Sequence, residues 1–335
     1  MQTNEINNKK LIFISGRFRS GTSMLWNIFN KLPQYQAWYE PLHPNLLSHI
    51  NYVKPKKDHL NIDDYWRSYA QLRDLADYHY SDFGQHRLFL EKHETWPELE
   101  DYINYLIRHA DNKTTVLQFN RADLRLSWLK NSFPNATIIH IERQPFPLWV
   151  SSRKHLQSAD DKHNESHADA YDLMQWSADL SRLFPMLLKA NNRSSYYRHY
   201  FIWKLAQNCA HAHADMHLSL EHDFHQNNNG IARLAKKLQW DEETQKLAND
   251  AIRLPQSAQQ ELHKDTHFTD IENDIDRLFK SLGLLKLYPS SCLAAIKLEY
   301  KQAWLKYSFN SDVLVQELLE AMKIQKDEIT ALNNN

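Results

Sequence analysis

The chain contains only 5 glycines and 2 cysteines among 335 residues, and its formal net charge is only −1. Two cysteines exclude a disulfide framework and fit a reducing compartment. The near-zero charge excludes a global positive field of the kind that holds nucleic acid, so an anionic ligand has to be bound by local arginines. The apolar run Leu11–Ser15 is far too short to span a bilayer.

The N-terminal segment from Gln2 to Lys10 is polar and contains no apolar signal segment. We therefore expect a cytoplasmic protein with no membrane span and no nucleic-acid partner. Hydrophobic residues make up 42% of the chain, which is enough for a substantial core. The length fits a single α/β domain with insertions.

Two of the five glycines, Gly16 and Gly21, stand close together between the apolar run Leu11–Ser15 and a helical pattern that begins at Met24. This order predicts a buried strand, a tight loop and a helix. The N-terminal end of a helix attracts anions, and glycines let the backbone fold closely around a phosphate. The predicted anion-binding residues of this loop are Arg17, Arg19, Ser20, Gly21, Thr22 and Ser23.

The two glycines have the spacing of a nucleoside-triphosphate P-loop, but Thr22 stands where that motif has lysine. The cation lies inside the loop instead, at Arg19, with Arg17 as a second candidate that would otherwise face solvent. The sequence therefore favours a P-loop scaffold and disfavours ordinary ATP or GTP hydrolysis. A solvated loop that happens to carry arginines is disfavoured, because strand, glycine spacing and helix all agree.

Glu40 follows a short strand predicted at residues 36–39, and two prolines, Pro41 and Pro44, end that strand. Ligands bind at the carboxyl ends of strands in open α/β sheets. Glu40 is therefore a candidate catalytic base, with His43 as a second candidate. The alternative for Glu40 is an ordinary solvated carboxylate.

Further apolar strands are predicted at residues 115–119, 136–142 and 216–220, and helical patterns cover residues 65–79 and 98–109. The predicted fold is an α/β, P-loop-type three-layer sandwich with a central parallel sheet and added helices. We expect this domain to span residues 1–285. A helical extension, residues 286–335, would pack on it or on a partner chain, which would allow a homodimer.

Arg143 closes the strand predicted at 136–142, and Ser151 lies on the first turns of the helix expected after Pro147. A guanidinium at a strand end and a hydroxyl on the next helix can hold one phosphate together.

Alternating polar residues at the start of the last strand suggest a metal site. They are His211, His213, Asp215 and His217. The run crosses from a helix end to a strand start, so one face need not collect all four side chains. We predict no metal.

Arg19-Ser20-Gly21-Thr22-Ser23 after one strand and Arg143 with Ser151 after another together resemble sulfotransferases. Residues 16–42 are most similar to the carbohydrate branch of that family. The resemblance implies that the opening loop binds the 5′-phosphosulfate of 3′-phosphoadenosine 5′-phosphosulfate (PAPS), and that Arg143 and Ser151 bind its 3′-phosphate. It also implies that Glu40 is the base, because related families use a glutamate at the comparable position.

Three positions depart from the common pattern of the family. Arg19 stands where many members have lysine, although an arginine variant is familiar. Met24 stands where cytosolic members have an aromatic residue, and Gln144 replaces a common acidic residue. The glycine-rich basic C-terminal loop of aryl sulfotransferases is also not evident, which disfavours a close aryl or steroid relative. Animal carbohydrate members carry a membrane anchor and none is evident here, so we expect a soluble bacterial-type enzyme.

Three functions remain open at this point. The first is a sulfotransferase that moves the sulfuryl group of PAPS to a hydroxyl of a small molecule or glycan, without a metal, and releases 3′,5′-ADP. The second is a P-loop nucleotide kinase, which the missing lysine disfavours. The third is a nucleotide-binding relative that has lost catalysis.

Overall fold

The structure is a computed structural model, and it describes residues 10–52, 62, 64–152, 170–187, 194–254 and 266–281. The chain divides into two compact units, Met1–Ser151 with Trp203–His263 and Ser152–Ile202 with Lys264–Asn335. The predicted C-terminal extension, residues 286–335, lies outside the described residues.

The first unit is built on a five-stranded sheet with the order β2-β3-β1-β4-β5, in which every pair of neighbours is parallel. The strands are β1 (Leu11–Ser15), β2 (Tyr35–Tyr39), β3 (Thr114–Phe119), β4 (Ala136–Glu142) and β5 (Met216–Ser219). These bounds confirm the predicted strands to within one residue. Apolar runs located β1, β3 and β4 because a parallel sheet is covered on both faces.

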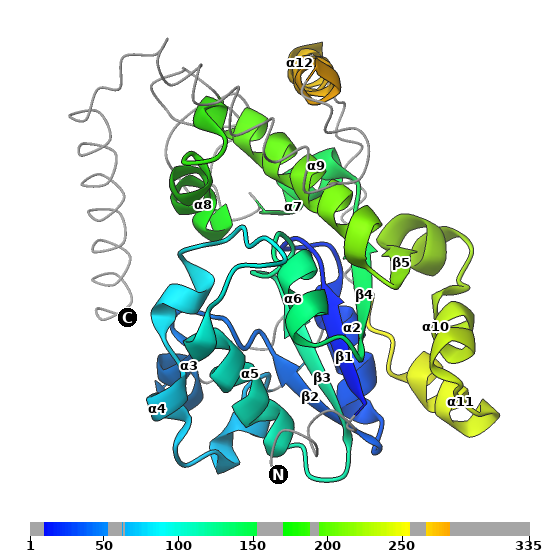
Figure 1. Cartoon of the computed structure of the whole chain (residues 1–335). Helices are drawn as coiled ribbons and strands as arrows, with labels where there is room; N and C mark the ends of the chain where they lie inside the picture. The colour runs from blue at the N-terminus through cyan, green and yellow to red at the C-terminus, as the bar shows by residue number, and fades with distance from the viewer. Residues whose placement is uncertain are drawn as a thin grey trace. The chain divides into compact units, whose positions relative to one another are not determined.

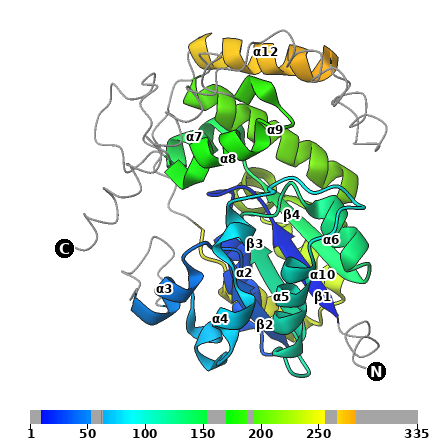
Figure 2. The ribbon, with the colours of Figure 1, turned by 60° about the vertical axis from the view of Figure 1, so that its left-hand side comes forward.

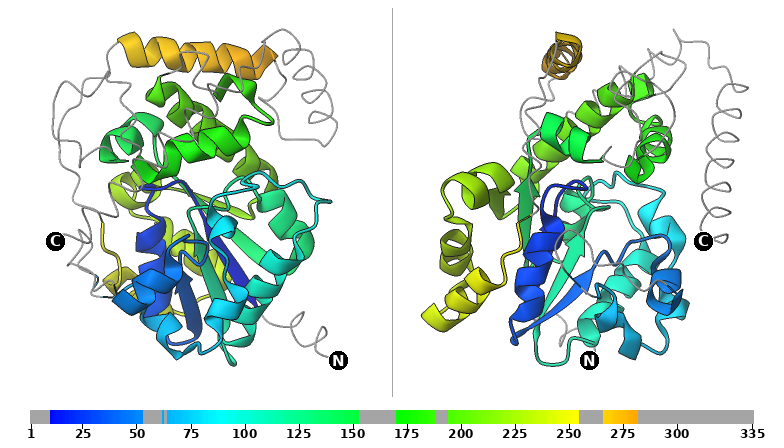
Figure 3. Two further views of the ribbon diagram at one scale, coloured as in Figure 1. Left: turned by 90° about the vertical axis from the view of Figure 1, so that its left-hand side faces the viewer. Right: turned by 180° about the vertical axis from the view of Figure 1, so that it is seen from behind.

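Helices cover both faces of this sheet, with α2, α10 and α11 on one face and α5 and α6 on the other (Figures 1 and 3). The α-helices are α2 (Thr22–Lys31), α3 (Leu46–Tyr52), α4 (Leu75–Tyr78), α5 (Pro97–Arg108), α6 (Leu126–Ser132), α7 (Pro145–Ser152), α8 (Leu173–Leu180), α9 (Ser195–His213), α10 (Gly230–Leu238), α11 (Glu242–Asp250) and α12 (Thr266–Ser281). The predicted three-layer α/β fold is confirmed.

Shorter helical turns complete the described secondary structure. They are the 3₁₀ turns η1 (Arg67–Gln71), η2 (Ser81–Gly84), η4 (Ala170–Asp172) and η5 (Pro185–Leu187), and the π-helix η7 (Leu220–Gln226). The predicted helix at 65–79 was wrong, because the extended backbone of Leu72 separates η1 from α4. Tyr69 is buried beside Trp38, with 5.1 Å between ring centroids, so tertiary packing overrides the helical pattern here.

In the second unit, α12 packs against the N-terminal half of α9 (Figure 2). Two tyrosines one turn apart on α9 donate to two acids one turn apart on α12. Tyr196 bonds to Glu272 at 2.5 Å and Tyr200 to Asp276 at 2.9 Å. Phe201 packs on Phe279 beside them, so this contact combines apolar packing with paired buried hydroxyls.

The sheet also buries a histidine, and this predicts acid sensitivity. Burial of His140 in β4, together with the charge of His217, lowers its pKa to about 3. Unfolded histidine has a pKa of about 6.5, so the unfolded chain binds the extra proton throughout the interval from pH 6.5 down to about 3. Stability is therefore fully present above pH 6.5 and falls as the pH drops through that interval. Between pH 6.5 and 5, the free energy of unfolding should fall by about 2 kcal/mol on this account.

Urea unfolding of the wild type and of His140→Gln at both pH values tests this expectation. The wild type should lose about 2 kcal/mol more than the variant over this interval. Equal losses in the two proteins would contradict a neutral buried His140.

Candidate functional site

The loop after β1 is closed so tightly that its glycines cannot be replaced without strain. A Cβ on Gly16 would lie 2.5 Å from the carbonyl oxygen of Ile141 and 2.6 Å from the Oγ of Ser20. Gly21 has a φ of 104° and forms the N-cap of α2. Both glycines bring the loop backbone close to the first amides of the helix, where an anion is favoured.

Ser20 lies inside this loop with its side chain turned away from solvent. Its residue is 1% exposed, and its Oγ has no hydrogen-bond partner among the described residues. A buried hydroxyl without a hydrogen-bond partner costs free energy unless a ligand or water bonds to it. The loop therefore offers a closed, donor-lined cradle of the kind that a phosphate or sulfate group requires.

Arg17 points into the protein, so the alternative of a solvent-facing Arg17 was wrong. It is 5% exposed, and its NH1 donates to Asp123 Oδ2 at 3.1 Å. Burial raises the pKa of the Asp123 carboxyl, while the charge of Arg17 acts in the opposite direction. This ion pair ties the anion loop to the segment after β3.

The structure brings Arg19, Arg143 and Ser151 together. Arg19 Nε donates to Ser151 Oγ at 3.2 Å, and Arg143 NH1 donates to the carbonyl oxygen of Arg19 at 3.2 Å. The Glu221 carboxylate lies 3.7 Å from Arg143 Nε and accepts from the amide of Gln144. The two sequence motifs, separated by more than a hundred residues, therefore form one cationic site.

Two candidate catalytic residues have backbone conformations that side chains rarely adopt. Arg19 has a φ of 68° and Glu40 a φ of 38°. Such residues cost free energy and persist where the surrounding structure holds them, often at active sites. Contacts with other parts of the structure therefore hold both residues in these backbone conformations.

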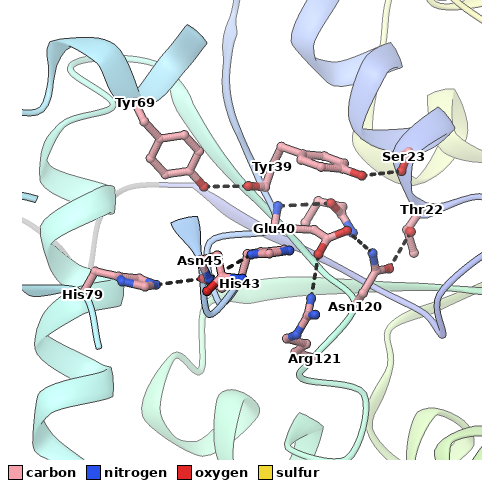
Figure 4. A network of polar contacts seen from close by, with 11 residues as sticks. Thr22, Ser23, Tyr39, Glu40, His43, Asn45, Tyr69, His79, Asn120 and Arg121 are labelled. Carbon is pink, nitrogen blue, oxygen red and sulfur yellow. Dashed lines mark hydrogen bonds and ion pairs between the residues drawn. The ribbon is translucent and has the colours of Figure 1, made fainter. Parts of the chain in front are cut away.

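The Glu40 carboxylate is buried at the end of β2 and is held from two sides (Figure 4). Asn120 Nδ2 donates to its Oε1 at 2.5 Å, and Arg121 NH1 donates to its Oε2 at 2.8 Å. Its backbone amide donates to the side-chain oxygen of Gln118 at 3.2 Å. Each carboxylate oxygen can accept more than one hydrogen bond, so both can still receive a proton.

The two hydroxyl groups at the start of α2 have partners within the protein. Thr22 Oγ1 donates to Asn120 Oδ1 at 2.7 Å. Ser23 Oγ and the hydroxyl of Tyr39 lie 2.9 Å apart (Figure 4). These side chains therefore link α2 to the strand ends, and the first backbone amides of a helix lack partners within the helix.

His43 lies near Glu40, but its ring is arranged to donate a hydrogen bond. Its Nδ1 accepts from the amide of Asn45 at 3.1 Å, so in the neutral ring Nε2 carries the proton. Burial, followed by the charges of Arg121, His49 and His79, lowers the pKa of His43 well below its ordinary value. The ring is therefore neutral at pH 7 and its available nitrogen is a donor.

A comparison with known protein families identifies the chain. Residues 12–200, more than half of its length, match the sulfotransferase family. The chain belongs to the sulfotransferase family. The match includes the anion loop, Glu40, Arg143 and Ser151, so sulfuryl transfer is the chemistry to which the described site has to be related.

Solved structures similar to this family member include two bacterial proteins. Sulfotransferase STF9 from Mycobacterium avium is 12% identical, with a TM-score of 0.36, and the alignment covers 92% of this chain and 80% of that one. The sulfotransferase domain of the Synechococcus PCC 7002 olefin synthase is 14% identical, with a TM-score of 0.33, covering 90% and 97%. No curated protein matches the chain.

Among the described residues of this family member, no helix has the length and apolar character needed to cross a membrane.

The polar segment after β3 contributes three side chains to the site that the sequence motifs did not predict. Asn120 and Arg121 bind Glu40, and Asp123 binds Arg17. All three residues are less than 7% exposed. A signal was present, because three polar or charged residues directly follow a buried strand at the ligand-binding edge of the sheet. No recognised motif contains these three residues, so the motifs did not predict their role.

Proposed function

We propose that this protein transfers the sulfuryl group of PAPS to a hydroxyl group of a small molecule or glycan and releases 3′,5′-ADP. The observation that carries the proposal is the meeting of Arg19, Arg143 and Ser151 beside a closed anion loop. A donor with anionic groups at both its 5′ and 3′ ends needs two such sites close together.

The opening loop suits the 5′-phosphosulfate. Its buried Ser20 hydroxyl has no partner among the described residues, and the space above Gly16 is too small for a Cβ. The first amides of α2 and the Arg19 guanidinium add donors to the same cradle. We assign Arg19, Ser20, Gly21, Thr22 and Ser23 to this part of the donor, and Arg17 supports the loop through Asp123.

Arg143 and Ser151 suit the 3′-phosphate. Burial lowers the pKa of Arg143, the Glu221 carboxylate raises it, and the charge of Arg19 lowers it. The buried guanidinium of Arg143 is stabilised in its charged form when a phosphate dianion binds beside it. Ser151 is buried and accepts a hydrogen bond from Arg19, so its hydroxyl lies beside the Arg19 guanidinium, and Arg143 contacts the same arginine.

PAPS supplies an activated sulfuryl group whose leaving group is a phosphate oxygen. Glu40 takes the proton of the acceptor hydroxyl while the acceptor oxygen bonds to sulfur and the bond from sulfur to the bridging oxygen breaks. Arg19 and the loop amides stabilise the negative charge that grows on the bridging oxygen. A base in this role contributes about 100- to 10,000-fold.

Glu40 suits the role of base better than His43. The Glu40 carboxylate is a pure acceptor with capacity left on both oxygens. His43 offers a ring N–H on its available side, so we assign it the orientation of the acceptor.

The donor assignment predicts a specific loss on replacement of Arg143. The wild type should bind 3′,5′-ADP about 10- to 100-fold more tightly than 5′-AMP, because a charge-assisted hydrogen bond contributes about 1.5–3 kcal/mol. Arg143→Ala should abolish this preference and leave 5′-AMP binding almost unchanged. Isothermal titration calorimetry with both nucleotides measures the effect.

Arg277→Ala is the matched control, because Arg277 is exposed and bonds only within its own helix to Asp274 in the described contacts. It should bind both nucleotides like the wild type. Transfer of labelled sulfate from PAPS to a panel of sugars and simple alcohols then tests catalysis. A wild type that binds neither PAPS nor 3′,5′-ADP would rule the proposal out.

A nucleotide kinase is disfavoured by the same loop. The position of the P-loop lysine is held by Thr22, whose hydroxyl donates to Asn120. Thermal-shift measurements should show stabilisation by PAPS and none by ATP with magnesium.

A further inference from the structure

Asn120 and Arg121, which follow β3, lie between the anion loop and Glu40. Asn120 bridges Thr22 Oγ1 and Glu40 Oε1 through the two ends of its amide, at 2.7 and 2.5 Å. Arg121 binds Glu40 Oε2 at 2.8 Å, and its guanidinium lies 4.7 Å from the ring centroid of Phe18 in the loop. Both residues therefore touch the candidate base and the donor loop at once.

The Glu40 carboxylate fixes the direction of both hydrogen bonds that link Glu40, Asn120 and Thr22. An ionised Glu40 only accepts, so Asn120 must present its NH₂ group to it. The Asn120 oxygen then faces Thr22, and the Thr22 hydroxyl must donate. The single proton of Thr22 is thus directed to Asn120, which sets the orientation of the first residue of α2.

The two contacts also fix the plane of the carboxylate. One oxygen is held by Asn120 and the other by Arg121, from two separate donors. The backbone of Glu40 has a φ of 38°, which a glutamate adopts only when its surroundings hold it. A carboxylate held in this way cannot rotate away from the loop without breaking at least one buried hydrogen bond.

We propose that Asn120 and Arg121 are positioning residues that hold the Glu40 carboxylate in line with the donor loop for proton removal from the acceptor. This inference rests on the proposed sulfuryl transfer. Both residues bind the Glu40 carboxylate rather than the transferred group, so each acts through Glu40 and, in the case of Asn120, also through Thr22. Their loss should slow the chemical step and leave donor binding intact.

The first test compares turnover with binding. Asn120→Ala should lower kcat about 10- to 100-fold, because small misplacements of a reacting group have effects of this size. The dissociation constant of 3′,5′-ADP, measured by calorimetry, should stay within about threefold of the wild type. Turnover is followed as release of 3′,5′-ADP from PAPS with the acceptor panel present.

Arg121 provides a conservative series for the same test. Arg121→Ala removes both the bond to Glu40 and the contact with Phe18, whereas Arg121→Lys keeps a positive donor. Activity should be lowest in Arg121→Ala and partly restored in Arg121→Lys. Equal activity in the two variants would contradict a positioning role for the charge.

The second test uses the pH profile, which a merely structural role would not move. Asn120→Asp places a second carboxylate against Glu40, and like charges that share a site raise the pH at which the pair loses its last proton. The acidic limb of the pH–rate profile should move upward by at least about one pH unit. Arg121 binds Glu40, Tyr69 interacts with its charge, and His43 bonds to its backbone carbonyl, with His49 and His79 acting on His43; all of these groups are the same in both proteins.

Asn249→Ala is the matched control, because the exposed side chain of Asn249 bonds only to the Gln245 carbonyl of its own helix in the described contacts. It should keep the wild-type kcat and pH profile. If Asn120→Ala keeps kcat within threefold of the wild type, the inference is wrong while the proposed function stands. If the wild type releases no 3′,5′-ADP from PAPS, the proposed function fails instead.

Melting curves show whether Asn120→Ala is folded at the assay temperature. Should it not be, the pH profile of Asn120→Asp decides, and an acidic limb that stays in place overturns the inference.

Discussion

Glu40→Gln is expected to lower kcat by about 100- to 10,000-fold, because the substitution removes the proposed proton acceptor and keeps the shape of the side chain. Glutamine can still be accommodated. If the amide of Asn120 turns over, its oxygen accepts from the new NH₂ group, and Thr22 Oγ1 changes from donor to acceptor. The variant should therefore fold and should bind 3′,5′-ADP like the wild type.

Steady-state kinetics with PAPS, together with calorimetry of 3′,5′-ADP, measure the two effects separately. Glu242→Gln on the exposed start of α11 serves as the control and should leave kcat unchanged. If the kcat of Glu40→Gln stays within threefold of the wild-type value, Glu40 is not the base.

Asp123→Ala is expected to lower the free energy of unfolding by about 3–5 kcal/mol, because it leaves the charge of Arg17 buried beside an apolar methyl group. Asp123 is 0% exposed and Arg17 5% exposed, so water cannot replace the lost partner. Asp123→Asn keeps an acceptor oxygen for Arg17 and should lose less. Urea-induced unfolding followed by tryptophan fluorescence gives the comparison.

The exposed pair Arg277–Asp274 is the matched control for this ion pair. Asp274→Ala should change stability by less than about 1 kcal/mol, because an exposed pair is screened by solvent. The double variant Arg17→Met with Asp123→Leu should be more stable than Asp123→Ala, since no buried charge remains. A loss in Asp123→Ala no larger than that of the control would show that Arg17 finds another partner.

These expectations separate two functions of the segment after β3. Asp123 stabilises the anion loop through Arg17, and its loss should appear in unfolding experiments. Asn120 and Arg121 hold the carboxylate of the proposed base, and their loss should appear in kcat and in the pH profile. Replacing these three side chains should therefore change different measured quantities, although the residues lie within four positions of one another.

The sequence by itself determined the fold and the position of the anion loop. Apolar runs located β1, β3 and β4, since strands covered on both faces are mostly apolar. Gly16 and Gly21 located the loop, because only glycine fits a Cβ position 2.5 Å from a carbonyl oxygen or a φ of 104°. Each of these requirements concerns a few neighbouring residues, so it can be recognised in the amino-acid sequence.

Only the tertiary structure decided which polar side chains meet. Asn120 lies 80 residues from Glu40, and Asp123 lies 106 residues from Arg17. In sequence, these residues resemble any polar loop after a strand, because pairing depends on strand order and on alignment of the strand ends. The sheet places β3 between β1 and β2, which puts the end of β3 beside both the anion loop and Glu40. That adjacency made Arg17 a buried partner of Asp123 and gave Glu40 the two donors that hold it.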